Sequence, residues 1–276
     1  MSQYGAKSAD EVGEYFDDRN WLYELFGTAA FNLHIGWFDG ADEETEPKDR
    51  LIDVLVEACG LGKGQRLLDV GCGFGRPAIR AAQITGAHVT GINISAKQVE
   101  QATALAAEAG LSETVVFEQA DGMRLPYPDD SFEHVWAVES VMYMSDRDQA
   151  LREIQRVLVP GGTFVLSDYV ERTELTAEQR SALKEGFTVD ALPTAEEYRA
   201  MLGSAGLTVE RFDDATEQLR VSAARIPQQL EKNAPIIAEK AGQEYADEFK
   251  AMVTRVGVLE RDVLGYLIAV AGKPKG

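Results

Sequence analysis

Short apolar runs alternate with helical patterns through the middle of the chain. The runs lie at 66–70, 88–92, 115–119, 134–138 and 163–169, and helical patterns separate them at 78–85, 96–109 and 148–158. Such strand–helix–strand units place their strands parallel in one sheet, with helices on both faces. Two further runs, at 207–212 and 264–271, predict a closing antiparallel pair. The pattern therefore predicts an α/β fold with a doubly wound, mostly parallel sheet of seven strands.

Helical segments flank this core on both sides. Residues 9–26 have apolar side chains at helical spacing, and a helical insert over 221–258 separates the last two predicted strands. We divide the chain into an N-terminal helical cap segment, a core, and a C-terminal part that carries the insert: 1–58, 59–172 and 173–276.

Composition limits the partners of the chain. Its 276 residues are 45% hydrophobic, which is enough to form a sizeable core. We find neither a signal-peptide pattern nor an apolar stretch that could span a membrane, so we expect a soluble cytoplasmic protein. The net charge of −19 disfavours nucleic acid and anionic membranes as partners. Cys59 and Cys72 lack neighbours at zinc spacing, so we predict no metal site, and the sequence leaves a homo-oligomer open.

A glycine-rich loop follows the first strand of the predicted sheet. The segment 67–77 reads "LLDVGCGFGRP", in which Asp69 precedes Gly71, Gly73 and Gly75, and Pro77 opens the next helix. Glycines at this edge of an α/β sheet let the backbone approach a ligand closely. The spacing differs from a dinucleotide fingerprint, and the proline removes an N–H that a pyrophosphate would use. We therefore predict a ligand other than a dinucleotide, although the glycines also suit a tight turn.

Polar side chains follow the next two predicted strands. Asn93 ends the second strand, where this class of fold places a side chain on a ribose hydroxyl. Ser95 and Gln98 form an S-x-x-Q pattern, which fits a helix capping box as well as a ribose contact. Asp121 follows the third strand and could bind an exocyclic amine or simply shape its loop.

Together these residues resemble the class I methyltransferases that use S-adenosylmethionine (SAM). The motifs are "LLDVGCGFGRP", "VTGINIS", "ADGMRLPYPDDSFEHVWAVES" and "REIQRVLVPGGTFVLSD", in the order and spacing of the family. The resemblance implies SAM as cofactor, with the glycines against its methionine part, Asn93 and Gln98 on the ribose, and Asp121 on the adenine. The full set of expected cofactor-binding residues is Asp69, Gly71, Gly73, Gly75, Asn93, Ser95, Gln98, Asp121, Gly122, Met123 and Glu139.

Outside the core, the chain is similar to a narrower group, the rebeccamycin sugar O-methyltransferase-like enzymes of bacterial secondary metabolism. The segment 31–37, "FNLHIGW", matches their N-terminal motif. This implies a helical cap over a small-molecule acceptor, with antibiotic biosynthesis as the setting. We expect O-methylation of a bulky apolar polyketide or glycosylated natural product. Aromatic residues and a methionine are the expected substrate-binding residues, although any one of them also suits packing of the cap: Tyr23, Phe26, Trp37, Met142 and Tyr143.

The expected acid–base residues depart from that group. Its paired histidines after the fourth strand are replaced here by Met142 and Tyr143, in "ESVMYMSD". A hydroxyl acceptor needs a base, so we predict that His34 or Asp168 takes that role. The E-x-x-M-Y pattern also resembles geranyl diphosphate C-methyltransferases, which methylate an alkene carbon, and in that case Tyr143 is the expected catalytic residue, as an aromatic face that stabilises a carbocation. A third possibility is a SAM-binding cyclase that transfers no methyl group.

Overall fold

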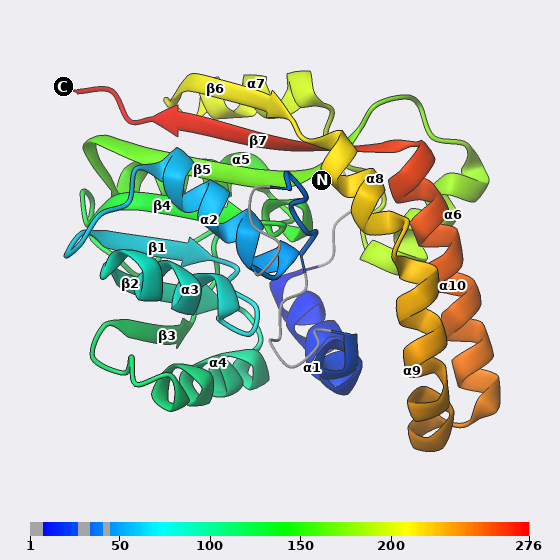
Figure 1. Cartoon of the computed structure of the whole chain (residues 1–276). Coiled ribbons are helices and arrows are strands. Elements are labelled where there is room, and N and C mark those ends of the chain that lie inside the picture. Colours follow the sequence, from blue (N-terminus) through cyan, green and yellow to red (C-terminus); the bar gives the residue numbers. More distant parts are fainter. Residues whose placement is uncertain (1–7, 27–33, 41–44, 276) are drawn as a thin grey trace.

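The computed structural model describes residues 8–26, 34–40 and 45–275. Its core is a seven-stranded sheet with the order β3-β2-β1-β4-β5-β7-β6 (Figure 1). The strands are β1 (Arg66–Val70), β2 (His88–Asn93), β3 (Val115–Gln119), β4 (Phe132–Val138), β5 (Leu158–Glu171), β6 (Thr208–Asp214) and β7 (Leu264–Gly272). The first five strands pair in parallel, and β7 runs antiparallel to both β5 and β6. The predicted fold class is therefore confirmed.

Side chains alternate between the two faces of the sheet and build a separate core on each. Leu67 and Trp136 belong to the core under α2 (Pro47–Cys59), α3 (Arg76–Thr85) and α4 (Ala96–Glu108). Leu68 and Val135, the next or preceding residues in the same strands, belong to the core under α5 (Arg147–Val157) and α7 (Ala195–Ser204). This period-two pattern, fully buried on both faces, is what a parallel sheet between two helical layers requires.

The remaining helices gather at the carboxyl ends of the parallel strands, on the right in Figure 1. They are α1 (Ala9–Phe26), α6 (Ala177–Phe187), α8 (Thr216–Ala223), α9 (Ile226–Ala241) and α10 (Gln243–Asp262). Three of these helices, α8, α9 and α10, lie between β6 and β7 and extend beyond both ends of the predicted insert at 221–258. α10 packs against α6, α8 and α9. At Gly186 in α6 an added Cβ would collide with Val256 of α10, so the missing side chain allows these two helices to approach closely. Among the described residues, no helix combines the length and apolarity needed to cross a bilayer.

Candidate active site

A cavity of about 340 Å³ lies where the parallel strands end, beneath α1 and α10. Its wall contains residues that follow β1, β2, β3 and β4, together with Tyr169 near the end of β5. In open α/β sheets, ligands bind in the crevice outside the carboxyl ends of the strands. The cavity therefore has the expected position for a binding site.

Glycine is required at the three positions after β1 for different structural reasons. All three have positive φ, at 83° for Gly71, 52° for Gly73 and 79° for Gly75. An added Cβ at Gly71 would collide with Ser140, and one at Gly75 would collide with Phe117. At Gly73 an added Cβ would meet nothing within 4 Å, and this glycine lines the cavity. Close packing explains the first and third glycine, whereas the second leaves room beside the cavity.

Asn93 and Gln98 form a buried polar pair at one end of the cavity. The side-chain amide of Asn93 donates to Gln98 Oε1 at 2.8 Å, and its Oδ1 accepts from the Ser95 N–H at 3.0 Å. Gln98 Nε2 has no hydrogen-bond partner among the described residues, although it is buried. Both residues line the cavity.

Ser95 has a structural role that the capping alternative anticipates. Its Oγ accepts from the Gln98 N–H at 3.1 Å and caps α4, but it is not among the residues that line the cavity. The reciprocal half of a capping box is not made, because the Gln98 side chain turns to Asn93. Ser95 Oγ also donates a short hydrogen bond to Asp17 Oδ1, which ties α1 to the start of α4.

The loop after β3 brings three predicted residues to the cavity: Asp121, Gly122 and Met123. Asp121 Oδ1 accepts from the Met123 N–H at 2.8 Å, so the turn alternative describes part of its role. An added Cβ at Gly122 would lie 2.8 Å from the Met144 side chain. Asp121 can therefore shape the loop and also face a ligand.

Asp69 supplies a buried carboxyl beneath the glycine loop. It is 1% exposed and lines the cavity. Burial raises its pKa to about 7, and the nearby Trp136 indole acts against that shift. Neither of its side-chain oxygens has a well-formed hydrogen bond within the described chain. Ionising a buried carboxyl without hydrogen-bond donors costs free energy unless a ligand supplies donors or positive charge.

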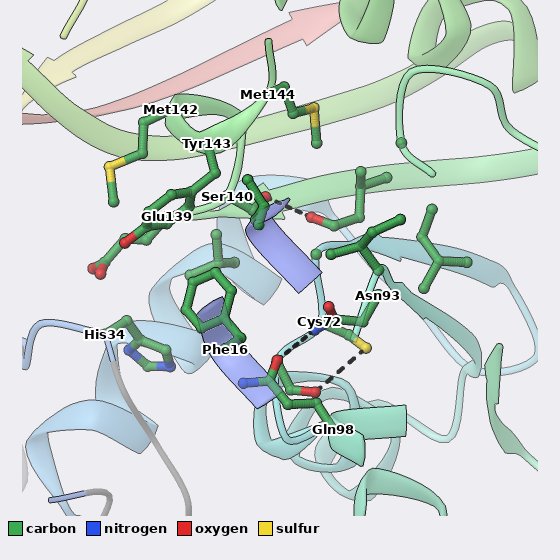
Figure 2. Close-up of a pocket in the computed structure, with 18 of the residues that line it drawn as sticks. Phe16, His34, Cys72, Asn93, Gln98, Glu139, Ser140, Met142, Tyr143 and Met144 are labelled. Atoms are coloured by element: carbon green, nitrogen blue, oxygen red, sulfur yellow. Dashed lines mark hydrogen bonds between the residues drawn. The ribbon is translucent and has the colours of Figure 1, made fainter. Parts of the chain in front are cut away.

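His34, Glu139 and Tyr143 lie at the other end of the cavity. Figure 2 shows them across Phe16 from Asn93 and Gln98. The Tyr143 ring packs edge-on against Phe16, with ring centroids 5.3 Å apart. Burial keeps the Tyr143 phenol protonated by raising its pKa far above the usual range.

His34 lines the cavity with a buried imidazole ring. Nδ1 lies 3.1 Å from the carbonyl oxygen of Ile35, so Nδ1 carries the proton and Nε2 keeps its lone pair. Nε2 has no partner among the described atoms. Burial lowers the pKa of His34 to about 4, which leaves the ring neutral at pH 7.

Glu139 is held in a strained backbone conformation directly after β4. Its φ is 49°, which is uncommon for a residue with a side chain. Oε1 accepts from the Ile35 N–H and from the Tyr266 hydroxyl, each at 2.9 Å. Burial is the main cause that raises its pKa to about 8, despite these two donors. The carboxyl therefore lies beside His34 and not within the glycine loop.

Several predicted residues are not brought to the cavity. Asp168 is fully buried, and its carboxylate accepts from the N–H groups of Met142 and Tyr169 and from the Tyr198 hydroxyl. It fixes the turn that carries Met142 and does not line the cavity, so we no longer assign it as base. Gly75 and Trp37 are also absent from the cavity wall, and Trp37 packs against the hydrophobic core. The side chains of Tyr23 and Phe26 lie outside the described residues.

The structure adds cavity residues that the sequence analysis did not select. Phe16 reaches the cavity from α1, Tyr169 from β5 and Glu260 from α10. Glu260 is 8% exposed and accepts a hydrogen bond from the Tyr169 hydroxyl at 3.2 Å. In the sequence, Glu260 is distinguished only as an acidic residue next to apolar ones near the end of α10. Without the fold, that pattern does not show that the side chain faces the cavity.

Comparison with known proteins gives a consistent picture. Residues 68–166 match a family model described as a methyltransferase domain. The 27-O-demethylrifamycin SV methyltransferase of Amycolatopsis mediterranei is 39% identical over 96% of this chain and 97% of that protein. The crystal structure of the [4+2]-cyclase SpnF has a TM-score of 0.85 and 32% identity, over 98% of each chain.

A third comparison concerns the fold alone. The geranyl diphosphate C-methyltransferase of Streptomyces coelicolor A3(2), solved with Mg²⁺, geranyl-S-thiolodiphosphate and S-adenosyl-L-homocysteine, has a TM-score of 0.75 at 18% identity. The match covers 98% of this chain and 99% of that one.

The cavity fits SAM, which is the cofactor. Gln98 Nε2 can donate to a hydroxyl, and the unpartnered carboxyl of Asp69 suits a positively charged ligand. Gly73 leaves space for a ligand beside its backbone. Acidic groups and the Phe16 and Tyr143 rings favour a sulfonium over a neutral thioether, and a cation–π contact contributes about 0.5–2 kcal/mol.

Proposed function

The chain belongs to the methyltransferase-domain family and is a SAM-dependent methyltransferase of natural-product biosynthesis; from that premise we propose that it methylates a hydroxyl of a bulky, uncharged acceptor. The charge of the cavity carries this proposal. Four carboxyl groups line it, from Asp69, Asp121, Glu139 and Glu260, and no lysine or arginine does so among the described residues. An anionic acceptor would find no lysine or arginine in this described lining to pair with, and it would raise the already raised pKa values of Asp69, Glu139 and Glu260 further.

The two halves of the cavity divide the work. Bound SAM supplies a methyl group on a positively charged sulfonium. Gly73, Asn93, Gln98 and Asp121 would hold the cofactor at the β1–β2–β3 side, as in the family this chain resembles. The apolar side chains at the β4–β5 side would hold the acceptor and exclude water. Alignment of two bound reactants can lower the barrier by about 7–11 kcal/mol.

We assign His34 as the base that takes the hydroxyl proton. His34 lines the cavity, its Nε2 has no partner among the described atoms, and the Ile35 carbonyl fixes the tautomer through Nδ1–H. Burial lowers the pKa of His34 to about 4, so the ring is neutral and can accept a proton at pH 7, although it is a weaker base than an exposed histidine. A positioned base contributes roughly 10² to 10⁴ in rate.

Specific observations also support two alternatives to O-methylation, which are alkene C-methylation and a SAM-binding cyclase. The Tyr143 and Phe16 rings could stabilise a carbocation, as alkene C-methylation requires. However, a prenyl diphosphate would place negative charge in an acidic cavity. The 32% identity with the cyclase SpnF supports a SAM-binding cyclase as a second candidate.

An acceptor comparison tests the proposal. The purified enzyme and methyl-labelled SAM are incubated separately with 27-O-demethylrifamycin SV, with geranyl diphosphate and with an extract of the host. We expect labelled product from a hydroxylated, uncharged acceptor and none from geranyl diphosphate. Methylation of geranyl diphosphate alone would refute the proposal and favour C-methylation.

A variant then tests the base. His34→Gln should lower kcat by roughly 10² to 10⁴ while the affinity for SAM stays unchanged. The matched control is His88→Gln, because His88 is exposed at the start of β2 and does not line the cavity. Equal turnover in the His34 variant and the control would remove His34 from this role.

A further inference from the structure

Glu260 is a buried carboxyl that α10 turns toward the cavity. It lies on α10 one turn after Val256, and both side chains line the cavity. The tight approach of α10 to α6 at Gly186 fixes this face of the helix toward the cavity. The side chain of Glu260 is buried, and burial raises its pKa to about 7.

Only one oxygen of this carboxyl is used by the protein. Oε1 accepts from the Tyr169 hydroxyl at 3.2 Å, whereas Oε2 makes no hydrogen bond with the described residues. Phe187 and Val256 form the apolar part of the nearby cavity wall, and the Glu139 carboxyl and the Tyr143 hydroxyl are close enough to interact electrostatically with Glu260. Replacing Glu260 alone by an apolar side chain would leave the buried Tyr169 hydroxyl without its partner, whereas replacing both residues by apolar ones of similar shape can be nearly neutral. The Tyr169 hydroxyl therefore accounts for Oε1 of Glu260 but not for Oε2.

The Tyr169 ring does not depend on Glu260 for its orientation. It packs edge-on against Tyr266 at 5.4 Å and lies 5.0 Å from the Phe187 ring, centroid to centroid. These contacts hold the ring, and its hydroxyl then directs the carboxyl of Glu260. Tyr169 acts here as a positioning residue.

Glu260 is also separated from the cofactor half of the cavity. Its partner Tyr169 is on β5, which lies two strands from β1 in the order β1-β4-β5. Neighbouring strands are about 4.8 Å apart, so the two strands are separated by about 10 Å. Glu260 therefore lies on the β4–β5 side of the cavity, which we assign to the acceptor, and away from the glycine loop after β1.

We propose that Glu260 is a specificity-determining residue whose Oε2 accepts a hydrogen bond from an acceptor hydroxyl other than the one that is methylated. The inference rests on the proposed function and narrows its substrate class. The acceptor is an apolar, uncharged molecule with at least two hydroxyl groups. One hydroxyl gives its proton to His34, and the other binds Oε2 of Glu260 on α10.

The test uses the acceptor that wild-type enzyme labels in host extract, purified and assayed with Glu260→Leu, Glu260→Gln and Glu260→Leu/Tyr169→Phe. We expect the acceptor KM to rise roughly 10-fold or more in both leucine variants, because a hydrogen bond to a carboxyl is lost. The glutamine variant should recover most of the affinity, since it can still bind a hydroxyl. kcat and SAM affinity should change less than about threefold, because the lost contact holds only the remote part of the acceptor.

Controls separate recognition from stability. Glu248→Gln makes the same chemical change on an exposed position of α10 and should behave as wild type. The double variant leaves no unpaired tyrosine hydroxyl, so its Tm should stay near that of wild type while its KM remains high. An unchanged acceptor KM in the double variant would overturn the inference about Glu260 and leave the proposed function standing. Absence of any labelled product with the wild-type enzyme would overturn the proposed function and this inference with it.

Discussion

Gly73 allows a direct test of how the glycine loop binds SAM. Its φ is 52°, and an added Cβ would point into space without meeting an atom within 4 Å. Gly73→Ala should therefore place a methyl group in the cofactor region of the cavity. We expect SAM affinity to fall roughly 5- to 150-fold, from an overpacking cost of about 1–3 kcal/mol. Gly73→Val should weaken binding further.

The backbone strain of this change can be measured separately. Alanine in the left-handed region costs about 1–2 kcal/mol, which lowers the Tm by a few degrees in a chain of this size. Gly64→Ala is the matched control, because Gly64 has a φ of 76°, is exposed and has an equally open Cβ direction. Both variants should lose similar stability, and only the Gly73 variant should lose SAM affinity.

Titration calorimetry and thermal unfolding supply the two readings for each variant. Gly75→Ala adds a contrasting case, since its Cβ would collide with Phe117 and it does not line the cavity. That variant should lose the most stability. Unchanged SAM affinity in a folded Gly73→Val protein would refute the reasoning.

Further outcomes follow from the cavity residues. Asp121→Ala should weaken SAM binding roughly 10- to 150-fold by calorimetry, because a hydrogen bond to a charged acceptor contributes about 1.5–3 kcal/mol; a lower Tm with unchanged affinity would leave only the turn role. A cation near Asp69 lowers its pKa from about 7, so at pH 7 SAM should release more protons on binding than S-adenosyl-L-homocysteine does. Calorimetry in buffers of different ionisation enthalpy measures this, and Asp69→Asn should abolish the difference; a difference that persists would exclude Asp69 as its source. The raised pKa of Glu139 means that its contribution to stability is complete below about pH 4.5 and is lost as the pH rises through about 8. The Tm of Glu139→Gln should therefore fall less than that of wild type between pH 5 and 9, and parallel curves would contradict this.

Local patterns were enough to predict most of the fold. β1 and β3 have the predicted bounds, because glycines and polar residues on either side of each short apolar run mark where the strand begins and ends. β5 begins at Leu158 and not at 163, since the chain through Pro160 continues in the sheet with a register shift. The cofactor-binding side of the cavity could be predicted from the sequence for a similar reason. Asp69, Gly73 and Asn93 lie at strand ends, and the topology brings those ends together.

The acceptor side depends on contacts between distant parts of the chain. Tyr169 and Glu260 are 91 residues apart and meet only after α10 has packed on α6. Asp168 is suitable as a base by residue type and position. Only the fold reveals that Tyr198 and two backbone N–H groups already occupy its oxygens. Sequence patterns record helix faces and strand ends, but not which buried polar groups satisfy one another.

The fate of a labelled methyl group tests the central claim most directly. The enzyme is incubated with SAM carrying a ¹³C-labelled methyl group and host extract, and the product is isolated and analysed by mass spectrometry and NMR. The account predicts one labelled methyl group, bonded to oxygen, on an uncharged acceptor that retains at least one free hydroxyl. A methyl group on carbon, or an unlabelled product that is an isomer of its precursor, would contradict it.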